Sequence, residues 1–222
     1  MQAIEFKQVT KTFMDGGKEL QALKPTNLTI NKGEFVAIIG PSGSGKSTFL
    51  TIAGGLQQPT EGQVLINQQA FSELNEKQRA KVRFKEIGFI LQASNLVPFL
   101  TVKNQFKLID KVNKSSQKDK AAEILNQLGI EDIANKYPED ISGGQKQRVA
   151  IAKALYNDPT VILADEPTAS LDSERAFEVV DILAQQSKAL NKAIVMVTHD
   201  LRLIEKCDRV FEMSDGILTE RK

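Results

Sequence analysis

The chain has 222 residues, which is enough for one α/β domain with an inserted lobe. Its 29 lysine and arginine residues almost balance its 28 aspartate and glutamate residues, so no strong overall field favours binding to nucleic acid or to an anionic membrane. No segment approaches the roughly 20 apolar residues that cross a bilayer, and the N-terminus lacks the features of a secretory signal. These observations predict a cytosolic protein, and any transport channel would belong to another chain.

The first part of the chain predicts a small β lobe followed by a buried strand and a helix. Residues 4–9 and 28–30 alternate between apolar and polar and flank a polar turn at Asp15, Gly16 and Gly17, which is typical of antiparallel strands. The apolar run at residues 35–39 ends in a glycine and precedes a helical segment at residues 46–53. Such a run predicts a buried strand that leads into a helix.

Residues 92–155 have a different pattern, with helical segments at 102–109, 117–128 and 144–155 and no convincing strand. This pattern predicts an inserted helical lobe. The lysines between residues 111 and 120 are flanked or interrupted by Asp110 and Asp119, and no aromatic residues lie among them. They therefore indicate a solvated face and not a nucleic-acid site.

The last part of the chain returns to strands and helices in alternation. Strands are predicted at residues 161–164 and 193–197, an amphipathic helix at 173–190, and a short hairpin at 209–218 around Ser214, Asp215 and Gly216. This order predicts an α/β fold with a mostly parallel sheet. We expect one domain, with a core from residues 1–91 and 156–222 and a helical subdomain from 92–155. The single cysteine, Cys207, excludes an internal disulfide and is expected to be a packed thiol.

The segment GPSGSGKST matches the phosphate-loop pattern and lies between a predicted strand and a predicted helix. Glycines let the backbone wrap around phosphates, the amides at the helix start face the anion, Lys46 neutralises charge, and Ser47 can ligate Mg²⁺. An ordinary glycine-rich turn is the alternative. The residues expected to bind nucleotide here are Gly40, Pro41, Ser42, Gly43, Ser44, Gly45, Lys46, Ser47 and Thr48.

The segment VILADEP places two adjacent acids at the end of a predicted strand. Asp165 is expected to hold the metal, and Glu166 is expected to polarise the attacking water as a general base. The alternative is a solvated acidic turn.

The segment ISGGQ lies where a helix is predicted to begin. A serine cap, exposed amides and the positive end of the helix dipole could together bind a phosphate at Ser142, Gly143, Gly144 and Gln145. A serine-capped helix without a ligand would leave the paired glycines unexplained.

The ordered set GPSGSGKST, Gln92, ISGGQ, VILADEP, ASLD and His199 resembles the nucleotide-binding subunit of the ATP-binding cassette (ABC) family over essentially the whole chain. The resemblance implies a P-loop NTPase fold that binds ATP and Mg²⁺ and hydrolyses ATP. Within the family, IGFILQASNLVPFLTV and ADEPTASLD resemble the MacB, LolD and FtsE-like branch, and most closely the ATPases of bacterial haem-efflux and antimicrobial-peptide-resistance exporters.

The resemblance also implies roles for residues that the motifs alone do not explain. Two copies would pack head to tail, with each ATP between the phosphate loop of one and the ISGGQ segment of the other. Gln92 would join the magnesium and water shell, His199 would contact the γ-phosphate, and Asp172 would act across the dimer.

Two positions depart from the family pattern. Phe13 occupies the place of a tyrosine that stacks on adenine, and it keeps the aromatic face while losing the hydroxyl. Lys103 stands where relatives commonly have glutamate, which concerns the helical lobe and not the ATP site. The apolar residues Leu96, Val97, Phe99 and Leu100 would lie near a groove for a permease helix, or would pack within the lobe.

These patterns predict a transport ATPase at the cytoplasmic face of the membrane. It would dimerise on ATP and drive a separate integral-membrane permease, with export of haem, a peptide antibiotic or another amphiphile favoured. One alternative is an FtsE-like ATP switch that signals through a membrane complex without moving cargo. Regulation of a nucleic-acid machine is disfavoured, because the chain has neither a coiled-coil insert nor a second cassette.

Overall fold

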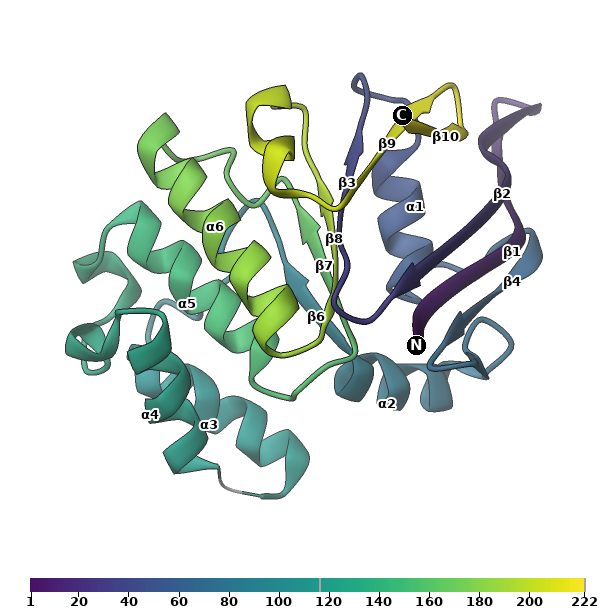
Figure 1. Ribbon diagram of the computed structural model, residues 1–222. Helices are drawn as coiled ribbons and strands as arrows, with labels where there is room; N and C mark the ends of the chain where they lie inside the picture. The colour runs from purple at the N-terminus through teal and green to yellow at the C-terminus, as the bar shows by residue number, and fades with distance from the viewer. Residues whose placement is uncertain (116, 222) are drawn as a thin grey trace.

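The computed structural model of the chain describes residues 1–115 and 117–221 and contains two β-sheets (Figure 1). One sheet is antiparallel, with the strand order β2-β1-β4-β5. Its strands are β1 (Gln2–Asp15), β2 (Lys18–Asn31), β4 (Glu61–Ile66) and β5 (Gln69–Ala70). The β1–β2 hairpin was predicted, whereas β4 and β5 were not.

The second sheet is mostly parallel and has the order β10-β9-β3-β8-β7-β6. Its strands are β3 (Phe35–Ile39), β6 (Ile87–Ile90), β7 (Val161–Asp165), β8 (Ala193–Val197), β9 (Arg209–Ser214) and β10 (Ile217–Arg221). All residues of β3 and β8 are buried, as expected for parallel strands covered on both faces. The predicted α/β class is confirmed.

Helices cover both faces of the parallel sheet. The α-helices are α1 (Lys46–Ala53), α2 (Glu76–Glu86), α3 (Val102–Asn113), α4 (Lys118–Gln127), α5 (Gly143–Leu155) and α6 (Ser173–Ala189). Short 3₁₀ turns are η1 (Glu131–Ile133), η2 (Pro138–Asp140) and η3 (Leu201–Lys206). The predicted helices are present with ends shifted by up to four residues, whereas α2 was not predicted.

Two hydrophobic cores lie on opposite faces of the parallel sheet. One contains Phe49 of α1 and Phe6 of β1, whose rings stack with centroids 4.5 Å apart. Figure 1 shows α1 between the two sheets. The other core joins the sheet to α5, α6 and the segment that contains α3 and α4. The phosphate loop is thereby fixed between β3 and a helix that is packed on both sides.

The described part of residues 92–155 contains α3, α4, α5 and 3₁₀ turns but no strand. The division of the chain into a core and a helical subdomain stays a prediction. None of the described helices is long and apolar enough to span a bilayer. Cys207 is half-buried, and burial together with the charge of Asp208 raises the pKa of its thiol to about 12.

Candidate functional site

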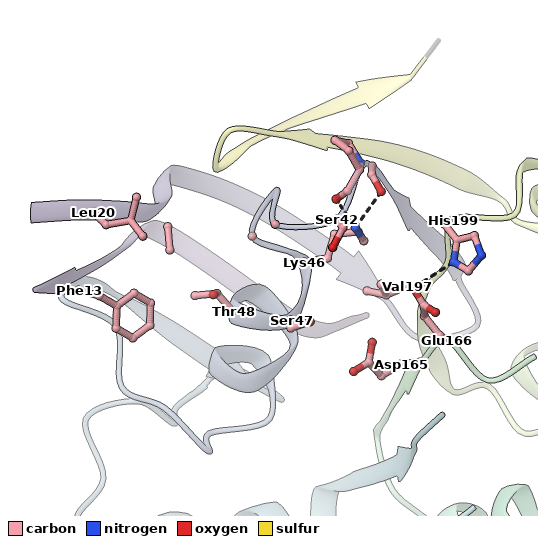
Figure 2. Close-up of a pocket in the computed structure, with 15 residues that line it drawn as sticks. Phe13, Leu20, Ser42, Lys46, Ser47, Thr48, Asp165, Glu166, Val197 and His199 are labelled. Carbon is pink, nitrogen blue, oxygen red and sulfur yellow. Dashed lines mark hydrogen bonds and ion pairs between the residues drawn. The ribbon is translucent and has the colours of Figure 1, made fainter. Parts of the chain in front are cut away.

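A cavity of about 580 Å³ opens between the loop after β3, the end of β7 and the β1–β2 hairpin (Figure 2). Because β3 and β7 are parallel strands on either side of β8, their carboxyl ends lie at the same edge of the sheet. Most of the predicted site residues meet here. Those that line the cavity are Phe13, Gly40, Pro41, Ser42, Gly43, Gly45, Lys46, Ser47, Thr48, Asp165, Glu166 and His199.

Two glycines let the loop after β3 curl around this cavity. Gly40 has φ 149°, and a Cβ there would lie 2.2 Å from the carbonyl oxygen of Met213. Gly45 has φ 110°, and its Cβ would lie 2.4 Å from the carbonyl oxygen of Ala22. Gly45 is also the N-cap of α1 and provides no side-chain hydrogen bond to the helix. The first amides of α1 therefore remain available to a ligand.

Lys46 is buried under the loop and donates hydrogen bonds to the carbonyl oxygens of Gly40 at 2.8 Å and Pro41 at 2.6 Å. Burial lowers the pKa of its ammonium, and the charges of Glu166 and Asp165 oppose this effect. The ammonium has a third N–H to donate. The hydroxyl of Ser44 is buried beside Gly40 and has no hydrogen-bond partner among the described residues. The Lys46 ammonium therefore fits an anion in the cavity, whereas Ser44 does not line it.

Asp165 ends β7, where it pairs with Val197 of β8. Burial raises the pKa of its carboxyl, the charge of Glu166 raises it further, and Lys46 lowers it. A divalent cation bound here would reduce the repulsion between the carboxylates of Asp165 and Glu166. Ser47 and Asp165 line one cavity with oxygen ligands, and Mg²⁺ takes such ligands together with phosphate oxygens. These two residues therefore fit a magnesium ion.

Glu166 is held in a left-handed backbone conformation with φ 44°. Its N–H donates to the carbonyl oxygen of Val197 at 3.0 Å, and its own carbonyl oxygen accepts from the N–H of Ala169 at 3.1 Å. Nδ1 of His199 lies 3.1 Å from Oε1 of Glu166, so the ring can donate to the carboxylate when Nδ1 carries the proton. A carboxylate, an imidazole and a cationic cradle for an anion thus face one space, an arrangement suited to hydrolysis of a phosphoanhydride.

Comparisons with known proteins agree with this geometry. The model of the family described as "ABC transporter" matches residues 23–169. The chain belongs to the ABC transporter family. It is similar to the "Putative hemin import ATP-binding protein HrtA" of Staphylococcus haemolyticus, with 45% identity over 96% of this chain and 98% of that protein. The protein of the same name from Staphylococcus aureus strain MRSA252 is 45% identical over 98% of this chain and 100% of the relative.

Solved structures of ABC cassettes have the same fold. A "Dimeric structure of a post-hydrolysis state of the ATP-binding cassette MJ0796 bound to ADP and Pi" has a TM-score of 0.88, with 40% identity, and the match covers 99% of this chain and 98% of that one. The structure of cbiO1 from Clostridium perfringens has a TM-score of 0.88, with 31% identity, over 98% and 87% of the two chains. The protein is therefore an ATP-binding ABC ATPase whose hydrolysis is coupled to transport.

The remaining predicted residues of the ABC ATPase lie outside the cavity. Gln92 is exposed just after β6. Asp172 caps α6 and accepts from the N–H of Arg175 at 3.0 Å. Ser142, Gly143, Gly144 and Gln145 form the exposed or half-exposed start of α5, where Ser142 and Gln145 make a capping box. The structure does not bring these residues to the phosphate loop of their own chain.

Three residues line the cavity that sequence reasoning did not select, namely Leu20, Ala22 and Val197. Leu20 pairs with Phe13 across the β1–β2 hairpin. This pairing could have been found by counting outward from the predicted turn, because the register follows from the turn. The position of Val197 could have been inferred only with the order of the strands.

Proposed function

We propose that two copies of the chain pack head to tail, and that each ATP lies between the phosphate loop of one copy and residues 142–145 of the other. The observation that carries this proposal is the start of α5. Its glycines and serine form a good anion-binding helix start, yet they lie on the surface and do not line the cavity that contains Lys46. The similar MJ0796 cassette is dimeric and bound to ADP and Pi, which supports a dimer that holds nucleotide.

Within this dimer the residues of the cavity would divide the reaction between them. Lys46 and the loop amides hold the β- and γ-phosphates, and His199 contacts the γ-phosphate. Glu166 accepts the proton of the water whose oxygen attacks the γ-phosphorus, and the bond to the β-phosphate oxygen breaks to release ADP. Ser47 and Asp165, joined by Gln92, would hold Mg²⁺, which neutralises the charge that develops on the phosphates. Asp172 acts across the dimer.

The membrane partner of this dimer would be an integral-membrane permease, which would keep the chain at the cytoplasmic face of the membrane. A second cavity of about 550 Å³ supports this part of the proposal. It lies between β6, α2, α3 and α5, and its apolar lining includes Leu56, Phe84, Phe89 and Leu91. Leu56 and Leu91 are exposed there, as expected of a docking surface. Phe99 is exposed nearby in sequence, whereas Leu96 packs against the core.

The proposed activity is export of an amphiphile. The names of the staphylococcal relatives make hemin the first cargo to test, and those names state import. Inside-out vesicles that contain the chain and its permease should accumulate hemin on addition of ATP. Loss of hemin from preloaded vesicles would instead establish import. ATP turnover that neither moves hemin nor responds to any candidate cargo would favour the signalling alternative.

Replacement Glu166→Gln tests the dimer directly. The amide cannot accept the proton, so ATP should be bound without turnover and should hold the two copies together. Size-exclusion chromatography with ATP should show a dimer, and chromatography without nucleotide a monomer. Glu73→Gln, an exposed glutamate in the turn before α2, is the matched control. A Glu166→Gln protein that stays monomeric and hydrolyses ATP normally would disprove both the dimer and the role of Glu166.

A further inference from the structure

One face of helix α2 carries three exposed lysines, each four residues from the next. The α2 lysine row consists of Lys77, Lys81 and Lys85. Side chains at i and i+4 are neighbours on a helix, and like charges at this spacing repel. Among the described residues, the one carboxylate within ion-pair distance of the row is that of Glu86, 3.2 Å from Nζ of Lys85. The other acid of the helix, Glu76, pairs with two arginines of α2 instead.

Helix α3 repeats the same pattern. The α3 lysine row consists of Lys103, Lys107 and Lys111, which are also exposed and spaced by four residues. Nζ of Lys103 donates to the side-chain oxygen of Asn135, and the ion pairs formed among the described residues include none of the three lysines. The one acid of α3, Asp110, accepts a hydrogen bond from the hydroxyl of buried Tyr156 at 2.9 Å. The charge of this row is therefore left to solvent or to a partner.

The two helices border the same apolar cavity, the one of about 550 Å³ between β6, α2, α3 and α5. Figure 1 shows α2 and α3 along the lower edge of the molecule. On α3, Leu108 and Val112 are exposed with 47% and 59% of their surfaces accessible. Like-charge pairs at i and i+4 destabilise a helix, so the fold itself gains nothing from either row. Two cationic rows beside exposed aliphatic side chains fit a partner that is both anionic and apolar.

We propose that the α2 and α3 lysine rows bind the anionic headgroups of a phospholipid bilayer, on either side of the cavity proposed to dock the permease. The inference deepens that docking, because a permease segment seated in the cavity would emerge from the same bilayer. Lysines close to an anionic leaflet are attracted to it, and the attraction ends within a Debye length. Leu108 and Val112 suit the boundary between headgroups and acyl chains, whereas a nucleic-acid backbone offers them no apolar partner. The local rows, and not the nearly balanced charge of the whole chain, carry the interaction.

Flotation of the full chain with protein-free vesicles tests the proposal. One set of vesicles is phosphatidylcholine alone, and the other is equal parts phosphatidylcholine and phosphatidylglycerol. At low ionic strength the chain should bind the mixed vesicles at least about tenfold more tightly, and 1 M salt should abolish this preference, because the Debye length then falls to about 3 Å. Equal binding to both vesicles, or binding to neither, would overturn the proposal. Because no permease is present, that result would leave the proposed docking cavity untouched.

Triple variants locate the binding surface. Replacing all three lysines of either row with glutamine, a good helix former, should lower the affinity for mixed vesicles by about 100-fold. The control changes the net charge equally by replacing three exposed lysines that lie outside both helices, namely Lys18→Gln, Lys188→Gln and Lys206→Gln. Affinity for ATP should be unchanged in all three proteins, which shows that they fold.

The control also decides between a defined surface and a general charge effect. An equal loss of vesicle binding in the control would overturn the assignment to α2 and α3. Retention of a DNA duplex that depends on the lysine rows, without binding to mixed vesicles, would assign the surface to nucleic acid and would overturn the proposal as well.

Discussion

The chain contains two helix starts built from glycines and serine, and they differ in what surrounds them. Gly45 caps α1 without a side-chain hydrogen bond, and the helix opens into a cavity that holds Lys46. At α5 the Ser142 side chain accepts from the N–H of Gln145 at 3.3 Å, and the Gln145 side chain accepts from the N–H of Ser142 at 3.0 Å. The first start needs a ligand to satisfy its amides, whereas the second is already capped while it lies at the surface.

The surroundings of the two helix starts fit their proposed roles, in which the start of α1 binds nucleotide and the start of α5 would control turnover. The α1 start has a cation, a buried hydroxyl at Ser44 without a partner among the described residues, and an enclosing loop. The start of α5 has only dipole and amides, and the Arg175 side chain lies so close that a Cβ added at Gly144 would be 3.2 Å from its Cδ. Helix-dipole effects at exposed sites amount to about 0.3–1 kcal/mol. The α5 start therefore adds little affinity by itself, and in the proposed dimer it would act on the nucleotide that the second copy holds.

The largest effect, on affinity for ATP, is expected at the start of α1. Lys46→Ala removes a charged donor from the phosphate site, and charged hydrogen bonds contribute about 1.5–3 kcal/mol each. Affinity for ATP should fall by about 100-fold, as measured by calorimetry. Lys77→Ala, on the exposed face of α2, should leave affinity unchanged. Unaltered binding by the Lys46 variant would remove the phosphate loop from the site.

The next prediction tests the start of α5 separately from the start of α1. Gly144→Asp places a carboxylate where the γ-phosphate of the other copy is proposed to lie, so hydrolysis should fall by about 100-fold. Binding of ATP by the monomer should not change. An aspartate in the first turn suits the helix dipole, and the flexible Arg175 side chain can move away from the new Cβ, so the fold should be retained. Normal hydrolysis by this variant would exclude α5 from the ATP site.

The elements with a clear hydrophobic pattern were predictable from sequence. The buried runs of β3, β7 and β8 and the helix after the phosphate loop were located almost to the residue. Helix α2 was missed because only Arg79 of its residues is buried. It depends instead on a capping box at Asn75 and on hydrogen bonds from Arg79 and Arg83 to the carbonyl oxygen of Gly55. Such distant partners leave no periodic signal.

In the candidate site, too, features that depend on partners distant in sequence could not be predicted. The phosphate-loop pattern was enough to select Lys46, and the end of a predicted buried strand was enough to select Asp165 and Glu166. The left-handed backbone of Glu166 and its contact with His199 depend on β8 lying beside β7. The turn between β4 and β5 was missed because Asn67 and Gln68 adopt positive φ values there without the glycine that usually marks such a turn.

A smaller effect concerns the stability that the folded chain loses by holding the ionised Asp165 carboxylate in the phosphate-loop cavity. Because the pKa of Asp165 is raised in the folded chain, its ionised form is less stable there than in the unfolded chain. The free energy of unfolding therefore falls as pH rises from the ordinary aspartate pKa to the raised one, and stays lowered above it. Asp165→Asn should melt a few degrees higher than the parent at neutral pH without nucleotide. This advantage should shrink as pH falls toward 3.8. Calorimetry of both proteins over this pH range gives the two melting temperatures. An Asp165→Asn protein that is less stable than the parent at neutral pH would refute the prediction.

The smallest effect compares two helix caps of the same design. Helices α2 and α5 both begin with a capping box, formed by Asn75 with Gln78 and by Ser142 with Gln145. Asn75→Ala and Ser142→Ala should each lower the free energy of unfolding by about 1 kcal/mol, which corresponds to a fall in Tm of roughly 2–4 °C for a chain of this size. Hydrolysis should decrease only in the Ser142 variant, since its hydroxyl is proposed to face the nucleotide of the second copy. Equal loss of hydrolysis in both variants would show that Ser142 acts through helix stability alone.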